Sequence, residues 1–66
     1  MKVFVNNQET DVASEATVAQ LLQQLQIHSP AVAVEVNLEV VPKQQHASLV
    51  LQDGDRLEIV TLVGGG

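Results

Sequence analysis

Apolar and polar residues alternate with a period of two in three parts of the chain, as they do in half-buried β-strands. These parts are residues 1–5, 32–36 and 56–62. In the last of them Leu57 and Ile59 share one face, and Glu58 marks the opposite face as outward. The pattern therefore predicts three strands, each with one face turned toward a core.

Two shorter strands are predicted beside these. A polar turn signal at residues 6–8 separates the first strand from a second at 9–13, so the two should form an N-terminal hairpin. Residues 37–39 turn the chain into a brief strand at 40–41, which ends at Pro42. Residues 43–48 are polar and could hold one helical turn, and Asp53-Gly54-Asp55 forms a turn before the last strand.

One amphipathic helix is predicted to begin at Thr17. Thr17 and Gln20 fit a capping box, in which each side chain bonds the backbone N–H of the other residue. The helix should end at residues 28–30, because the residue before a proline disfavours the α region. Its apolar stripe follows the spacing i, i+3, i+4, i+7 and consists of Val18, Leu21, Leu22 and Leu25.

Together these elements predict an α+β domain, with one helix packed on a mixed sheet of four to five strands. Residues 1–62 should form this domain and residues 63–66 a flexible glycine-rich tail. The sequence contains no internal repeat and no sign of a second domain. The helix should cover the sheet face that carries Val3, Val5, Val34, Leu57 and Ile59.

Composition narrows the classes of function. The chain has 66 residues, 45% of them hydrophobic, and no cysteine, so its core must hold by apolar packing without disulfides. A net charge of −5 and a single aromatic residue argue against binding to nucleic acid. No stretch is long and apolar enough to cross a bilayer, and the N-terminus lacks the features of a signal peptide. We therefore expect a cytoplasmic protein.

The titratable residues form no recognisable catalytic or metal-binding set. His28 and His46 stand alone, with no second ligand at metal spacing and no nucleophile–base pair. Asp53 and Asp55 are similar to the acids of a calcium loop, but the remaining ligand positions are absent. We therefore expect a protein that is not an enzyme and that binds no metal or cofactor itself.

The C-terminal residues Val63, Gly64, Gly65 and Gly66 are the candidate functional site. Glycine has no Cβ, so three glycines in a row can enter a narrow channel that a side chain would block. Four extended residues reach roughly 13 Å beyond the last strand. The sequence therefore predicts that Gly66 carries the chemistry. The alternative is a frayed terminus without a role.

Several groups of residues lead to a family. They are the helix that begins at Thr17, the strand end at residues 34–37, Val41-Pro42, the turn at 53–55 and the glycines at 64–66. In these groups, in the order of its elements and in its length, the whole chain resembles the ThiS family of sulfur carriers in thiamine biosynthesis. The resemblance implies a ubiquitin-like β-grasp fold, with the first and last strands parallel and central.

The resemblance also implies a function for the tail. Gly66 would be adenylated by a ubiquitin-activating-like adenylyltransferase that consumes ATP. With sulfur from a donor protein it would become a thiocarboxylate, which donates sulfur to thiazole synthase. Carriers of molybdopterin synthesis and of tRNA thiolation share the diglycine end, so these pathways remain alternatives. A β-grasp interaction module with an incidental tail is another.

A docking face is predicted beside the tail. Phe4, Val60 and Leu62 lie on the outward side of the first and last strands, which would be neighbours, so they should form one contiguous apolar patch. We expect this patch to bind the activating enzyme or the sulfur acceptor, with acidic residues steering the approach. The alternatives are that it has no role or that residues 43–52 cover it. The free protein should be a monomer.

Overall fold

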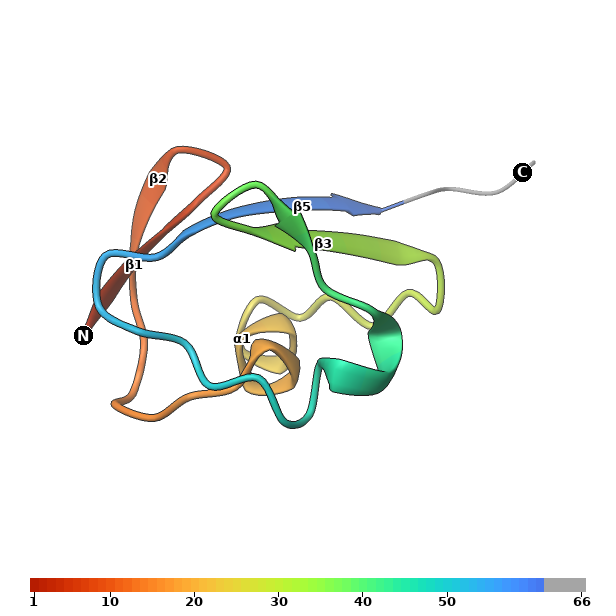
Figure 1. Cartoon of the computed structure of the whole chain (residues 1–66), viewed down its shortest axis with the longest axis horizontal. Helices are drawn as coiled ribbons and strands as arrows, with labels where there is room; N and C mark the ends of the chain where they lie inside the picture. Colours follow the sequence, from red (N-terminus) through yellow and green to blue (C-terminus); the bar gives the residue numbers. More distant parts are fainter. Residues whose placement is uncertain (62–66) are drawn as a thin grey trace.

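The computed structural model describes residues 1–61 and folds as one helix against a five-stranded sheet (Figure 1). The sheet order is β2-β1-β5-β3-β4; β1 and β5 are parallel, and the other neighbours are antiparallel. This confirms the predicted α+β fold and its central parallel pair. The elements are β1 Lys2–Val5, β2 Gln8–Asp11, α1 Val18–Gln24, β3 Val32–Val36, β4 Glu39–Val40, the 3-10 helix η1 Lys43–Gln45 and β5 Arg56–Thr61.

The hydrophobic core lies between α1 and the inner face of the sheet. All five sheet residues predicted to face the helix are buried, and so are Val18, Leu21 and Leu22 of the helical stripe. Leu25, the last residue of that stripe, is only partly buried. The connecting segments add Val12, Ala16 and Leu51 to the core. Because alternate residues of the strands are buried against α1, the opposite face of the sheet is its outer face (Figure 1).

Two tight turns set the register of the hairpins. Asn6 and Asn7 have φ angles of 49° and 69°, and Asn37 and Leu38 have φ angles of 51° and 70°. Two consecutive left-handed residues are typical of the type I′ turn, which joins antiparallel strands with a two-residue loop. Each turn is therefore one residue shorter than predicted, and β2 begins at Gln8 and ends at Asp11.

The helix begins where predicted but ends earlier. The Thr17 hydroxyl accepts a bond from the Gln20 N–H at 3.2 Å, and the Gln20 side chain accepts one from the Thr17 N–H at 2.9 Å. The helix ends at Gln24 because Gln26 adopts a left-handed φ of 59°. The N–H groups of Gln26 and Ile27 then bond the last carbonyls in a Schellman motif, so proline is not what stops the helix.

Candidate functional site

The strand that leads to the tail is central in the sheet. β5 is flanked by β1 on one side and by β3 on the other, and its last residue, Thr61, is also the last that the structure describes. The predicted site residues Leu62, Val63, Gly64, Gly65 and Gly66 lie outside the described residues. The described part of the site is therefore the end of β5 and the outer face around it.

The side chain of Asn6 holds the end of β5. Its Oδ1 accepts a hydrogen bond from the backbone N–H of Ile59 at 2.8 Å, and its Nδ2 donates one to the carbonyl of the same residue at 3.1 Å. The sequence indicated only a turn at Asn6. The signal in the sequence for this contact was an asparagine in the turn directly after β1, the strand that pairs with β5.

Phe4 and Val60 both lie on the outer face, but they do not form one contiguous patch. The parallel register places Phe4 opposite Arg56, and Val60 lies four residues further along β5, about 13 Å away at the rise of a strand. Val60 pairs instead with Ala33 of β3. The predicted contiguity of these two residues was wrong, because the sequence did not give the register. Their role in docking stays a prediction.

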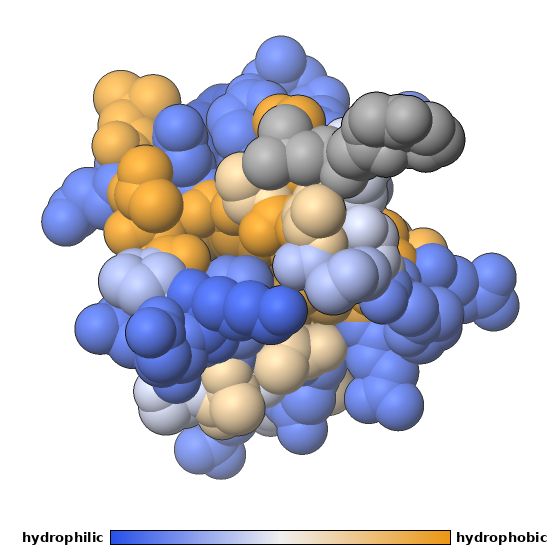
Figure 2. Space-filling model, turned by 90° about the vertical axis from the view of Figure 1, so that its right-hand side faces the viewer, coloured by the Kyte–Doolittle hydropathy of each residue, from blue (hydrophilic) through white to orange (hydrophobic). Residues whose placement is uncertain are grey.

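The outer face mixes apolar and polar residues, since Val60 and Ala33 lie beside Glu58 and Glu35 there. Figure 2, which views the molecule from the side toward which β5 runs, shows apolar and polar surface next to each other. Residues 43–52 do not cover this face, since the carbonyls of His46 and Leu49 accept bonds from the N–H groups of Ala19 and Val18 on the helix side. Val60 is 53% exposed. An apolar side chain thus remains open to a partner near the end of β5.

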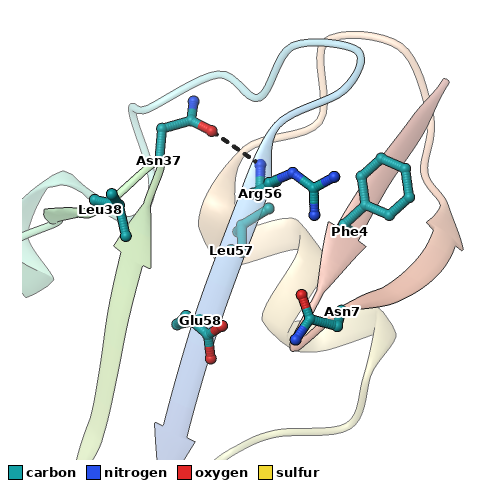
Figure 3. Close-up of a pocket in the computed structure, with 7 residues that line it drawn as sticks. All are labelled: Phe4, Asn7, Asn37, Leu38, Arg56, Leu57 and Glu58. Carbon is teal, nitrogen blue, oxygen red and sulfur yellow. Dashed lines mark hydrogen bonds between the residues drawn. The ribbon is translucent and has the colours of Figure 1, made fainter.

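A hollow of about 410 Å³ opens at the start of β5, at the end of the strand away from the tail (Figure 3). Asn37 accepts a bond from the Arg56 N–H at 3.0 Å, and the Arg56 guanidinium lies 4.7 Å from the centroid of the Phe4 ring. The hollow lies at the opposite end of β5 from Thr61, the last residue that the structure describes. It is lined by Phe4, Asn7, Asn37, Leu38, Arg56, Leu57 and Glu58.

Two acidic residues face each other on the outer face of the sheet, between the positions of Phe4 and Val60. Glu35 of β3 and Glu58 of β5 are directly opposed in the sheet, on its outer face. Within residues 1–61 neither forms an ion pair. Like charges at opposed positions destabilise a sheet, so this pair is an electrostatic cost that a basic partner would relieve. The predicted acidic surroundings of Val60 are therefore present.

A second charge cluster lies on the N-terminal hairpin. Lys2 Nζ donates a hydrogen bond to Asp11 Oδ1 at 2.9 Å and lies 3.9 Å from Glu9 Oε2. The hydrogen bond and the positive charge of Lys2 lower the pKa of Asp11 below its ordinary value of 3.8. The same bond and the neighbouring carboxylates raise the pKa of Lys2. Both side chains are exposed, so this pair contributes little to the stability of the fold.

The buried histidine has a structural contact. His46 is 8% exposed, and its Nε2 lies 3.2 Å from the carbonyl oxygen of Val41.

Among residues 1–61 no three histidine, cysteine or acidic side chains are grouped as metal ligands. In the same part of the chain no helix has the length and hydrophobicity needed to span a membrane.

The topology defines a class of protein. One helix on a five-stranded sheet with a central parallel β1–β5 pair is the ubiquitin-like β-grasp fold. The chain matches the ThiS family over residues 1–66, and it belongs to that family. As a member it is a sulfur carrier of thiamine biosynthesis, which is the branch that the sequence favoured.

Individual relatives agree with the family. The chain is 33% identical to the sulfur carrier protein ThiS of Escherichia coli, over the whole length of both chains. It is 47% identical to a segment of a thiazole synthase of Paramagnetospirillum magneticum, all of this chain spanning 20% of that protein. The crystal structure of a thiamine biosynthesis protein (ThiS) from Geobacter metallireducens matches over all of both chains, with a TM-score of 0.84 and 32% identity.

Proposed function

We propose that Gly66 is the reacting residue of the carrier and that its C-terminal carboxylate becomes a thiocarboxylate. The observation that carries the proposal is that the family match runs through Gly66 and so includes the three glycines. The absence of a Cβ at Gly66 supports it too, because nothing on the residue hinders approach to the carbonyl carbon.

The chemistry requires two steps. A carboxylate is a poor electrophile, so one of its oxygens first attacks the α-phosphorus of ATP, which releases pyrophosphate and forms an acyl adenylate. Hydrosulfide released by a sulfur donor protein then attacks the carbonyl carbon and displaces AMP, and loss of the proton from sulfur leaves the thiocarboxylate. The carrier thus acts as a co-substrate. The ubiquitin-activating-like adenylyltransferase supplies the groups that stabilise the charges of each transition state and binds the ATP.

The acceptor of the sulfur in this proposal is thiazole synthase. A segment similar to this chain is part of a protein of that name in Paramagnetospirillum magneticum, so a segment of this kind and a thiazole synthase occur there in one polypeptide. The outer face near Val60, with its opposed Glu35 and Glu58, supplies an apolar and acidic surface for either partner. A basic docking face on the partner would relieve the repulsion between these two carboxylates.

Intact mass spectrometry tests the proposal. The chain is incubated with ATP, sulfide and a ubiquitin-activating-like adenylyltransferase, and its mass should rise by the difference between sulfur and oxygen. Omission of ATP is the control and should leave the mass unchanged. An unchanged mass with an adenylyltransferase that activates another carrier of this family in the same assay would contradict the proposal.

A further inference from the structure

We infer that Asn6 is a positioning residue that fixes the end of β5 and so presents the glycine tail to the adenylyltransferase. The inference rests on the function proposed for Gly66. Its basis is the pair of hydrogen bonds that joins one side-chain amide to both backbone groups of Ile59, at 2.8 and 3.1 Å.

The amide of Asn6 takes the place of a missing rung in the β1–β5 ladder. The N–H groups of Phe4 and Asn6 donate to the carbonyls of Asp55 and Leu57, which are alternate residues of the same strand edge. The next rung falls at Ile59, but β1 ends at Val5 and the chain turns away. The Asn6 side chain is short, carries a donor nitrogen and an acceptor oxygen, and belongs to a residue type that tolerates φ of 49°, so it supplies both bonds.

This rung lies two residues before the end of the strand. β3 pairs with the other edge of β5 as far as Thr61. Without the amide, the edge of Ile59 that faces β1 would have no partner among the described residues, and β3 alone would hold the end of β5. The chain could then leave the sheet in a wider range of directions. The adenylyltransferase would have to order it on binding, and this cost reduces affinity for the carrier.

The chain contains a matched control at the other end of the same strand. Asn37 occupies the same position in the second type I′ turn, with φ of 51°, and its Oδ1 accepts the backbone N–H of Arg56 at 3.0 Å. Glycine tolerates positive φ, so Asn6→Gly and Asn37→Gly remove a side-chain clamp without straining either turn. Asn6→Gly frees the end of β5, and Asn37→Gly frees the start of the same strand.

The experiment compares the full-length parent and both glycine variants at a temperature at which all three are folded. Activation is followed as carrier-dependent exchange of pyrophosphate into ATP with the adenylyltransferase, and amide hydrogen exchange is followed by NMR. For Asn6→Gly we expect the KM for the carrier to rise about tenfold, with kcat within about twofold of the parent. The Ile59 amide should exchange faster in this variant only, and Asn37→Gly should keep the parent's KM.

The outcomes separate positioning from simple stability. Both variants lose backbone bonds to β5, so a purely structural role would lower both melting temperatures and leave both KM values unchanged. Equal KM values for the two variants would therefore overturn the inference. A parent that supports no exchange, with an enzyme active on another carrier, would instead overturn the proposed function and with it the role of Asn6 in that reaction.

Discussion

The guanidinium of Arg56 lies 4.7 Å from the centroid of the Phe4 ring, so a cation covers the aromatic side chain on the outer face of the sheet. The two residues are directly paired across β1 and β5. The same register places Val60 four residues further along β5, next to Thr61, and its side chain is 53% exposed. Val60 is therefore the better test of the predicted docking face.

Val60→Asp should weaken binding to the adenylyltransferase or to thiazole synthase at least about tenfold, or about 1.4 kcal/mol. An exposed apolar side chain that a partner buries is replaced here by a charge that resists desolvation. The dissociation constant is measured by calorimetry and the melting temperature by circular dichroism. The matched control is Val50→Asp, at a position that is 47% exposed on the loop beside α1. Unchanged affinity for the Val60 variant would remove this face from the docking surface.

Glu58→Gln should stabilise the free domain slightly and slow its association with a basic partner. It removes one of two like charges that are opposed in the sheet, an effect of about 0.2–1 kcal/mol. It also weakens electrostatic steering, so the association rate should become less sensitive to salt. Stopped-flow measurements at two ionic strengths check the rate. Glu15→Gln makes the same change in charge in the loop before α1 and should alter neither the stability nor the association rate. A similar effect of Glu15→Gln would show that net charge alone causes the change.

Deletion of Gly66 should abolish adenylation and leave the melting temperature unchanged. Among the described residues a continuous core already runs from Val3 to Ile59, so we expect the fold to hold without the last glycine. Gly66→Val should also block activation, because a β-branched side chain crowds the carbonyl carbon. Intact mass and a thermal melt are the two measurements. Thiocarboxylation of either variant at the parent's rate would remove Gly66 from the chemistry.

Leu21→Ala should destabilise the fold by about 2–5 kcal/mol, the usual range for a fully buried leucine. A domain of this size has a total stability near the lower end of about 5–15 kcal/mol, so we expect partial unfolding at 37 °C. Urea denaturation gives the free energy of unfolding. Gln23→Ala, on the exposed side of the same helix, is the control and should change the stability little.

Asp11→Asn should remove a small, salt-sensitive contribution to stability whose dependence on pH has a defined sign. The pKa of Asp11 is lowered in the folded state, so its contribution is present above the ordinary value of 3.8 and is lost as pH falls through the lower folded pKa. The parent and variant should therefore converge in stability at low pH. Lys2→Met removes the charge that pairs with Asp11 and so tests the other member of the ion pair. A difference between parent and Asp11→Asn that grows as pH falls below 3.8 would contradict this assignment.

The sequence by itself determined the elements and the face that each one buries. Alternation in residues 32–36 and 56–62, and the helical spacing from Val18, depend only on local periodicity and on the preference of apolar groups for a core. The capping box at Thr17 is equally local. Family membership and the candidate tail also followed from residues that stand next to one another in the chain.

Only the tertiary structure decided how distant residues meet. Whether Phe4 lies beside Val60 or beside Arg56 depends on the register of two strands about fifty residues apart, and period two allows several registers with the same buried face. The end of α1 at Gln24 depends on the left-handed Gln26, for which no glycine gave a signal. The bonds from Asn6 to Ile59 depend on the parallel pairing itself, because these two residues are far apart in the sequence and meet only when β1 and β5 lie side by side.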